Sequence, residues 1–468
     1  YGNWALDLRG SYWDRRHLED YQSDFNDPEN NEVGSEIRVD LRHRAPLKPG
    51  IELRSRLFGD AIPYRGDWIY SDPGWCAGLT VRCRSYEQDI ATLYGVEEVL
   101  TWDWFVDNRF VTLAGADLRG RTVKDRIDVE ELDTGVSSGI PGFADYNVTT
   151  AAGSLFLQQV VSPVPKFGLN VGARLDLDQL FGAHVSPRAA AMVHPWKGGT
   201  LKLIYSEAFR APVAGEVNFQ DPTYHVKAAD LDAEVVRSTE LSVEQRLPEG
   251  LGRVRVGGFG SWWSGLVGER SLTQEEFDAA VAAGDLIPEA DPDYSVTYAN
   301  FGKMFAAGGF LSANLQNRTG LFRFGTNVSF TESFVYGDGE RYDVARVPDW
   351  IVNLRAAVAP GGYVPTFALA TFYNSPRRTT EDVDGEFEVG SIADHLIRAR
   401  FVISGDLPKA TGLRYRIWSD YSFGRYGPYV RGQLNYAEDD SFGGELTPLD
   451  RLYLFAGLRW DFDYRKQK

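Results

Sequence analysis

Apolar and polar residues alternate along this chain from one end to the other. Near the start, residues 36–42 read Glu-Ile-Arg-Val-Asp-Leu-Arg. In the middle, residues 169–176 read Leu-Asn-Val-Gly-Ala-Arg-Leu-Asp, and near the end residues 458–465 read Leu-Arg-Trp-Asp-Phe-Asp-Tyr-Arg. Because successive side chains of a β-strand point to opposite faces, this pattern predicts strands with one apolar face and one face that carries charges of both signs.

The connections between these strands alternate between short and long. The short ones are turn-like, at residues 163–166, 195–199, 248–251, 317–320 and 360–364. The long ones are polar, at residues 14–32, 64–84, 129–147, 212–235, 271–293 and 379–394. Tight turns at one end and long loops at the other are typical of outer-membrane barrels, whereas soluble sandwiches keep both ends short. The pattern therefore predicts an all-β fold, a transmembrane up-and-down antiparallel β-barrel with residues 1–468 in one domain.

The predicted strands are long. Residues 254–268, 296–315 and 322–335 exceed the usual strand of a globular sheet and suit the roughly ten tilted residues that cross a bilayer. Counting strand–turn–strand–loop units gives about 18 strands, with an error of about two either way. Within one long loop, residues 273–284 are a predicted helix, because Ser271 or Thr273 can cap its start and Gly284 closes it.

Composition agrees with an exported all-β protein. The 468 residues include 23 Tyr, 27 Phe and 12 Trp but only two Met, and the net charge of −17 argues against a nucleic-acid partner. The sequence has no signal peptide and no run of about 18 apolar residues that could cross a membrane as a helix. A barrel strand conceals its apolar face in alternation, so low mean hydropathy does not argue against a membrane protein.

Two cysteines, Cys76 and Cys83, lie close together in a polar and aromatic stretch. They can be two free thiols, but a disulfide in a loop hairpin suits an oxidising compartment better. A redox or zinc site is not indicated, because the spacing is wrong and no further Cys or clustered His is present.

Sequence signatures of catalysis and cofactor binding are missing. The six histidines are scattered, without the spacing of a metal site, so we expect no metal and no cofactor. The sequence contains no nucleophile elbow, no phosphate-binding loop and no dinucleotide-binding fingerprint. The chain is therefore predicted not to be an enzyme, with no catalytic residues.

The segment from Ile62 to Tyr86 is the best candidate for contact with a ligand. It is predicted to be a long extracellular loop in which aromatic and charged residues cluster around the cysteine pair. The ligand-contact candidates are Tyr64, Arg65, Trp68, Tyr70 and Trp75. The alternative is a self-packed loop whose aromatic residues only stabilise it.

One segment carries a family resemblance. Residues 186–216 read SPRAAAMVHPWKGGTLKLIYSEAFRAPVAGE, which resembles a strand–turn–strand segment in the middle of the barrel of TonB-dependent outer-membrane receptors. Weaker similarities follow in the family's order at residues 231–247 and at Asn300-Phe-Gly302-Lys. The residues that match the family's motifs are Ser186, Pro187, Arg188, Phe209, Arg210, Ala211, Pro212, Glu216, Glu240, Asn300 and Gly302.

The resemblance carries expectations about architecture. Members of the family have a 22-stranded barrel filled by an N-terminal plug, which is preceded by a short box that binds TonB. Neither the plug nor the box is visible in this sequence, and about 18 strands are predicted. If Tyr1 opens at the family's fifth strand, one cause explains both differences, because the plug and the first four strands would lie upstream of this chain.

The resemblance also implies a function and partners. It predicts an integral protein of the bacterial outer membrane that takes up a scarce extracellular ligand, such as a metal chelate, with energy supplied through TonB. The expected partners are the lipid bilayer and lipopolysaccharide, a small extracellular ligand, TonB through a plug outside this chain, and partner proteins in a membrane complex. The alternatives are a plugless structural barrel that anchors a surface complex and a passive porin. The sequence does not identify the ligand.

Overall fold

The computed structural model describes most of the chain. The described residues are those of 1–468 other than 1, 17–26, 72–75, 77–81, 138–144, 229, 338–339, 345–346, 379–391, 394, 409–411, 424–425, 431–445, 449–450 and 461–468. They form one 20-stranded sheet and two separate two-stranded ladders. No helix among them is long and apolar enough to cross a membrane.

The large sheet is built from long strands that follow one another along the chain. The first six are β1 (Asn3–Arg16), β2 (Asn31–Lys48), β3 (Ile51–Tyr70), β4 (Cys83–Asp103), β5 (Phe110–Glu131) and β6 (Tyr146–Val164). The next six are β7 (Phe167–Asp178), β8 (Gly182–Val193), β9 (Gly199–Arg210), β11 (Glu234–Leu247), β12 (Gly252–Ser271) and β13 (Val296–Gln316). The last six are β14 (Phe322–Gly337), β16 (Trp350–Val358), β17 (Thr366–Asn374), β20 (Leu396–Asp406), β21 (Leu413–Phe423) and β24 (Leu452–Trp460).

Six further strands are short. β10 (His225–Val226) and β15 (Glu340–Asp343) belong to the large sheet. β18 (Arg377–Arg378) pairs with β19 (Ile392–Ala393), and β22 (Tyr426–Val430) pairs with β23 (Leu446–Pro448). Without β10 and β15, the 20-stranded sheet has 18 strands, so the predicted count of about 18 is confirmed.

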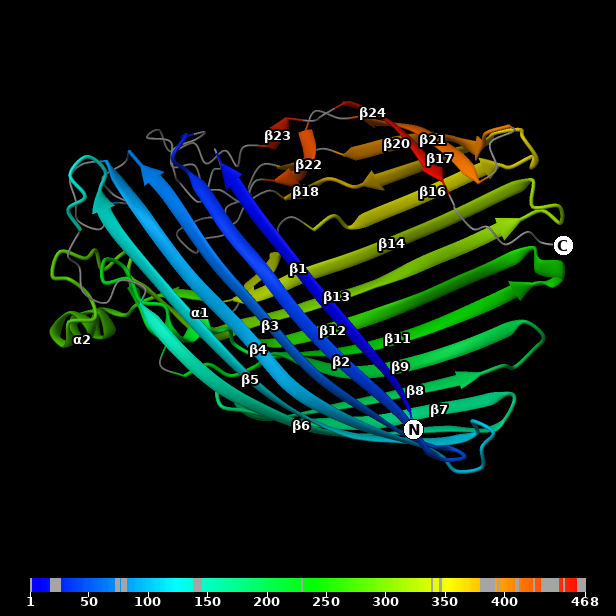
Figure 1. Ribbon diagram of the computed structural model, residues 1–468, viewed down its shortest axis with the longest axis horizontal. Coiled ribbons are helices and arrows are strands. Elements are labelled where there is room, and N and C mark those ends of the chain that lie inside the picture. Colours follow the sequence, from blue (N-terminus) through cyan, green and yellow to red (C-terminus); the bar gives the residue numbers. More distant parts are fainter. Residues whose placement is uncertain are drawn as a thin grey trace.

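The long strands form an antiparallel meander that curls around a lumen. Each pairs with the next long strand in the chain, and β1 to β6 cross in front of the strands behind them at a steep angle (Figure 1). The five predicted turns lie at one end, for example between β6 and β7 and between β8 and β9. Long connections lie at the other end, so the predicted up-and-down barrel with short turns and long loops is confirmed.

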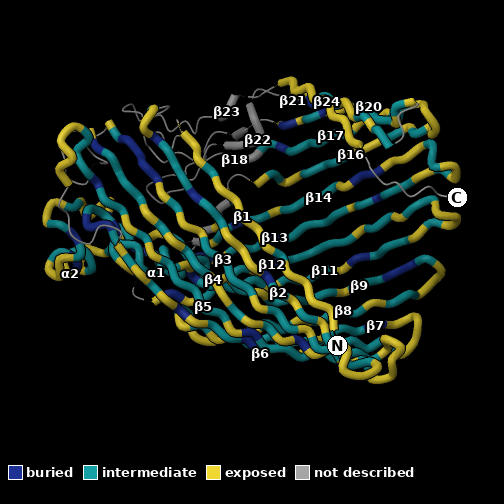
Figure 2. The backbone as a smooth tube through the Cα atoms, viewed as in Figure 1, coloured by how far each residue is buried: buried dark blue, intermediate teal, exposed yellow. Residues whose placement is uncertain are grey.

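The strand register separates an apolar face from a charged one. Leu6, Leu41, Leu57, Val96 and Leu118 are partners across β1 to β5 and form one row on the outer face. Leu57 and Leu118 are 58% and 65% exposed, and exposed and half-buried residues alternate along the strands (Figure 2). An exposed apolar surface of this kind is the side that contacts lipid.

The neighbouring row has the opposite character. Shifted by one residue, the partners across the same five strands are Ala5, Arg42, Arg56, Glu97 and Asp117. Because the side-chain period of a strand is two, this row faces the lumen wherever the first row faces lipid. The wall is therefore apolar outside and charged inside.

The ladder of paired strands has two ends. β1 pairs with β2, and β24 pairs with β21. Within the described residues the ladder contains no pairing of β1 with β24, and β1 stands at the front of the molecule (Figure 1). The large apolar side chains of β1 are widely exposed, with Trp4 and Leu8 at 66% and 65%.

Two helices lie in the long connections. α1 (Ala214–Asn218) follows β9, and α2 (Gln274–Ala283) follows β12. The helix predicted at residues 273–284 is confirmed as α2. Thr273 caps it by accepting a hydrogen bond from the Glu276 backbone, Glu276 bonds back to the Thr273 backbone, and Gly284 ends it with a positive φ of 80°.

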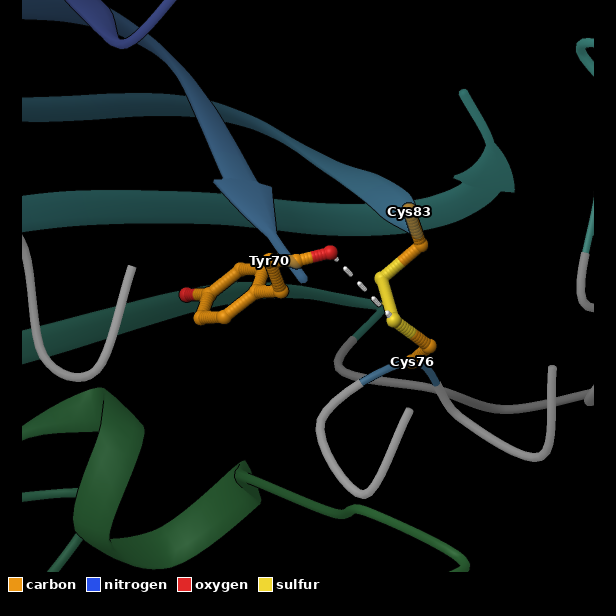
Figure 3. Close-up of a disulfide and its surroundings, with 3 residues drawn as sticks. All are labelled: Tyr70, Cys76 and Cys83. Carbon is orange, nitrogen blue, oxygen red and sulfur yellow. Dashed lines mark hydrogen bonds between the residues drawn. A yellow bond between two sulfur atoms is a disulfide. The ribbon is translucent and has the colours of Figure 1, made fainter. Parts of the chain in front are cut away.

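The predicted disulfide is confirmed. Cys76 and Cys83 are bonded, with their Cα atoms 5.6 Å apart, and Cys76 Sγ lies 3.9 Å from the Tyr70 carbonyl oxygen (Figure 3). Both cysteines are fully buried and pack against Val129, with partly buried Tyr70 and Ile127 beside them. The disulfide therefore ties Cys76, which lies between β3 and β4, to the start of β4 beside the outer end of β5.

Replacing both cysteines, in Cys76→Ser/Cys83→Ser, is expected to loosen this tip without opening the barrel. The disulfide closes a loop with a sequence separation of 7, and its loss should destabilise the tip by about 2 kcal/mol. Limited proteolysis should cut the variant between β3 and β4, as it should cut the reduced wild type. Heat-modifiable migration on gels should persist, and its loss would show that the barrel itself needs the disulfide.

Candidate functional site

The lumen wall of the first strands carries ion pairs of both signs. Asp40 accepts hydrogen bonds from Arg42 and Arg56, both at 2.8 Å, and Asp117 accepts one from Arg174 at 2.7 Å. The two carboxylates are 5% and 6% exposed, and this surface lines a cavity of about 540 Å³. Because each buried acid is neutralised by an arginine, the wall presents fixed guanidinium groups whose charge is already paired.

Arginine–aspartate pairing also occurs near the other end of the sheet. Arg400 of β20 and Asp420 of β21 form a bidentate pair with both distances at 2.6 Å, and Arg398 donates to Ser422 at 3.3 Å. Planar, bidentate arginine groups of this kind suit ligands that carry carboxylate or other anionic oxygens.

The aromatic segment predicted as a loop is the outer end of a strand. β3 continues to Tyr70. It pairs with β2 as far as Asp67 and with β4 as far as Tyr70, whose partner is Cys83. Residues 64–70 therefore belong to the wall, and the prediction of a loop beginning at Tyr64 was wrong. A barrel strand can continue above the membrane for as long as its neighbours pair with it, so a run of aromatic residues does not mark its end.

The ligand-contact candidates are divided between the two faces. Tyr64 and Trp68 share the lumen face, where a Cβ on Gly66 between them would lie 2.5 Å from Trp68 Nε1. Trp68 is only 5% exposed, and Tyr70 packs beside the disulfide. Arg65 lies on the outer face, 4.7 Å above the Tyr86 ring. The fifth candidate, Trp75, lies outside the described residues.

The strongest part of the family segment forms a clamp at the outer end of β9. Arg210 donates to both oxygens of Glu234 at 2.7 and 2.6 Å, and to both oxygens of Glu216 at 2.9 and 3.0 Å. Glu216 also accepts from the Val213 backbone at 2.8 Å, and Glu234 accepts from the Val267 backbone at 2.9 Å. Arg210 therefore fixes α1 to the start of β11 and, through Glu234, to β12.

Other motif residues support the same region. Asn300 of β13 donates to the carbonyl oxygens of Asp232 at 3.0 Å and Gly265 at 2.7 Å, and it accepts from the Asp232 backbone at 2.8 Å. Gly302 faces the bulge in β12, where an added Cβ would lie 2.8 Å from Leu266 Cβ. These residues shape the base of an outer connection.

The remaining motif residues are spread over neighbouring strands. Ser186, Pro187 and Arg188 lie in β8, where Ser186 is the partner of Arg174. Glu240 of β11 pairs with Arg255 of β12 on the lumen face. Phe209 contacts the Phe181 and His184 rings, with centroids 5.1 and 4.8 Å away. Ala211 and Pro212 follow β9, and Pro212 is fully buried.

Two outer connections pack together as one unit, which we call the cap: residues 211–233 and residues 272–295. The Ile287 backbone N–H donates to the Pro222 carbonyl and the Val296 N–H to the Tyr224 carbonyl, both at 2.8 Å. β10 pairs in parallel with the start of β13, and Leu286 is 2% exposed. The cap therefore has a small core of its own above the barrel.

His225 lies at the centre of the cap and is fully buried. The rings of Phe219, Tyr298 and Tyr224 surround it, with centroid distances of 5.0, 5.0 and 6.0 Å. Burial lowers the pKa of His225 to about 4. Burial also raises the pKa of Asp221, which forms backbone hydrogen bonds with His225. The sequence does not reveal this role of His225, because its burial depends on Tyr298 of β13 as well as on its own connection.

One cluster of carboxylates also went unnoticed in the sequence. Glu87 and Asp89 of β4 and Asp125 of β5 each place an oxygen within 4.8 Å of the others, and all three are half-buried. They are the one group within the described part of the chain that could share a metal ion, and their hard oxygens suit Ca²⁺.

The fold and its wall define a class of protein. A sheet of long antiparallel strands with an apolar outside, a charged lumen, tight turns and large outer connections is a transmembrane β-barrel of the outer-membrane type. The profile of the family described as TonB dependent receptor-like, beta-barrel matches residues 1–403. The chain belongs to this family, whose members are barrels of the bacterial outer membrane and are transporters and not enzymes.

Solved structures of the same fold differ widely in sequence. The siderophore receptor PirA from Acinetobacter baumannii has a TM-score of 0.67 at 12% identity, over 98% of this chain and 68% of that one. The FrpB iron transporter from Neisseria meningitidis has a TM-score of 0.65 at 10% identity, over 97% and 68%. No curated protein sequence matches the chain.

The ferric-catecholate import receptor Fiu from K12 E. coli has a TM-score of 0.60 at 10% identity. The match covers 86% of this chain but 61% of that receptor, so the chain spans less than two thirds of its length. At these identities the likeness shows the fold alone.

Replacing Arg210 by Gln is expected to loosen residues 211–233. The change leaves Glu216 and Glu234 close together without a shared cation, and since Arg210 is 42% exposed the loss should be about 1 kcal/mol. Hydrogen exchange of the backbone amides of α1 measures it. Arg210→Lys should restore part of the protection, because Lys keeps the charge but not the fork of donors. Unchanged exchange in Arg210→Gln would contradict the clamp.

Acid is expected to open the cap. His225 has a folded pKa of about 4 and an unfolded value near 6.5, so the folded cap binds fewer protons and loses stability as the pH falls from about 6.5 towards 4. Between pH 7 and pH 5 the loss should be about 2 kcal/mol. Hydrogen exchange of residues 219–226, corrected for its intrinsic pH dependence, measures the change.

The matched control for the acid response is His225→Phe, which keeps a ring and cannot be protonated. Its cap should lose less stability between pH 7 and pH 5 than the wild-type cap, because no imidazole is left to be protonated. Asp221, whose pKa is raised, acts in the opposite direction in both proteins. Equal responses of the two proteins would show that His225 is not the titrating group.

Proposed function

We propose that this chain forms the wall of a receptor that takes up a scarce extracellular ligand, such as a metal chelate, with energy supplied through TonB. Family membership over residues 1–403 carries the proposal. Two of the structural neighbours are described as a ferric-catecholate import receptor and a siderophore receptor, which favours a chelate as the ligand. No covalent step is required, since the ligand passes through the wall unchanged.

The chemistry of the lumen supports an anionic ligand. Arg42, Arg56 and Arg174 hold their guanidinium groups in fixed positions on buried carboxylates, beside a cavity of about 540 Å³. A chelate that carries catecholate or carboxylate oxygens can accept further hydrogen bonds from these groups without the cost of ordering them. Tyr64, half-buried on the lumen face near the outer end, is the remaining candidate for contact at the entrance.

We also propose that further strands and a plug complete the barrel. In hydrocarbon an unpaired backbone N–H or C=O costs several kcal/mol, and the edge of β1 away from β2 has no partner in the ladder of the described residues. β1 begins, and β24 ends, at the end of the barrel that carries the short turns. An even number of strands between them therefore preserves the antiparallel meander. TonB would act through the plug.

Uptake by cells that produce the full-length natural protein tests this function. With ⁵⁵Fe supplied as catecholate, hydroxamate or citrate chelates, uptake of at least one should saturate and should stop on deletion of TonB or addition of a protonophore. The variant Arg56→Gln/Arg174→Gln should lower uptake about tenfold at low ligand concentration, because it removes donors and leaves Asp40 and Asp117 less neutralised.

The matched control removes two cations from the short turns, in Lys197→Gln/Arg318→Gln, and should take up the chelate normally. Uptake that rises linearly with ligand concentration and is unaffected by the protonophore would contradict the proposal and would indicate a passive pore. No uptake of any chelate and no conductance in lipid bilayers would favour a structural barrel that anchors partner proteins.

A further inference from the structure

The three carboxylates Glu87, Asp89 and Asp125 lie together on the lumen face near the outer ends of β4 and β5. Asp89 is the cross-strand partner of Asp125, and Glu87 follows on the same face of β4 two residues from Asp89. An oxygen of each lies within 4.8 Å of the others. Like charges directly opposite one another destabilise a sheet, and one cation in contact with all three carboxylates would remove this repulsion.

The cationic side chains nearby have other partners or lie on another face. Arg65 and Arg126 each pair with an aspartate two residues further along their own strand, at 3.2 and 2.9 Å. Lys124 precedes Asp125 in β5 and therefore points to the opposite face of the sheet. These three cations line the outward part of a cavity of about 440 Å³, whose lumen-facing part is lined by Tyr64, Asp89, Asp125 and Tyr146.

Buried polar atoms without partners lie at this place in the wall. The Oδ1 atoms of Asp89 and Asp125 are buried, and neither has a hydrogen-bond partner within the described residues. The indole N–H of Trp68 is likewise buried without a partner there, in a side chain that is only 5% exposed. Because buried polar groups in folded proteins are almost always satisfied, these atoms point to a ligand that supplies both a cation and a hydrogen-bond acceptor.

Gly66 allows the Trp68 indole to reach the carboxylates. A Cβ on Gly66 would lie 2.5 Å from Trp68 Nε1 and 2.9 Å from the Tyr64 hydroxyl oxygen, so both polar groups lie over Gly66. Gly66 is the cross-strand partner of Glu87, and Tyr64 is the partner of Asp89. The side chains of directly paired residues begin only about 5 Å apart, so the indole N–H lies beside the carboxylates.

We propose that Glu87, Asp89 and Asp125 bind one hydrated Ca²⁺ ion, and that the Trp68 indole N–H donates a hydrogen bond to a water molecule on that ion. Bonds from Ca²⁺ to oxygen are about 2.3–2.6 Å long, so oxygens up to about 5 Å apart can contact the same ion. Mg²⁺, with bonds of about 2.0–2.1 Å, needs oxygens that lie closer together. The inference does not depend on what the barrel transports.

The proposed ion lies next to a contact between the wall and the cap. Tyr146 of β6 is the cross-strand partner of Asp125, and its hydroxyl oxygen would lie 3.5 Å from a Cβ on Gly215 of α1. An ion on Asp125 therefore holds the outer ends of β4 and β5 together beside the strand that the cap contacts.

Terbium luminescence of the full-length natural protein in detergent tests the site, because Tb³⁺ occupies Ca²⁺ sites and accepts energy from a nearby indole. Excitation of tryptophan should give Tb³⁺ emission that saturates. Ca²⁺ should displace the Tb³⁺ with a dissociation constant of about 0.1–1 mM, the range of extracellular calcium modules, and Mg²⁺ should displace far less. Trp68→Phe should lose most of the emission and should bind ⁴⁵Ca²⁺ about fivefold more weakly, because one hydrogen bond is lost.

The variant Asp89→Asn/Asp125→Asn should bind ⁴⁵Ca²⁺ at least about tenfold more weakly, because it removes two of the three charges. The matched control, Asp128→Asn/Glu130→Gln, removes two acids from the opposite face of β5 and should bind as the wild type does. If heat-modifiable migration shows that the cluster variant misfolds, the single variant Asp125→Asn should still bind more weakly than Asp128→Asn. Equal ⁴⁵Ca²⁺ binding by a folded cluster variant and its control, or equal displacement of Tb³⁺ by Mg²⁺ and Ca²⁺, would overturn the proposal.

Discussion

Backbone hydrogen bonding between neighbouring strands is the interaction on which this structure depends. Within hydrocarbon there is no water to replace a lost partner, so each strand is held by the next one along the chain. The same pairing fixes the register, and the register decides which side of the wall each residue faces. Leu57 faces lipid and Arg56 faces the lumen, and a slip of one residue between β2 and β3 would exchange them.

The features that sequence predicts well are those set by neighbours in the chain. Period two indicates the strands, and polar breaks indicate the turns and long connections. Thr273, Glu276 and Gly284 determine both ends of α2 through bonds within four residues. Cys76 and Cys83 are also close enough in sequence for their pairing to be anticipated. Local chemistry is sufficient in each case, so the fold followed from the sequence almost completely.

The features that escaped prediction depend on residues far apart. The segment from Tyr64 to Tyr70 reads as a loop until β2 and β4 are seen to pair with it. The face on which Arg65 lies follows from that register and not from its aromatic neighbours. His225 is buried in part by Tyr298 of β13, which comes more than seventy residues later in the chain. The candidate site was therefore predicted as a set of residue types, while their grouping required the structure.

The strands differ in length, and this affects how molecules approach the lumen. β5 has 22 residues and β8 has 12, so at a tilt of about 40° they rise about 55 and about 30 Å along the barrel axis. The apolar band takes up about 25 Å of that height. The rim is therefore high over β3 to β5 and low over β7 and β8, which gives the entrance a slope. A bulky molecule can therefore approach the lumen more easily over β7 and β8 than over β3 to β5.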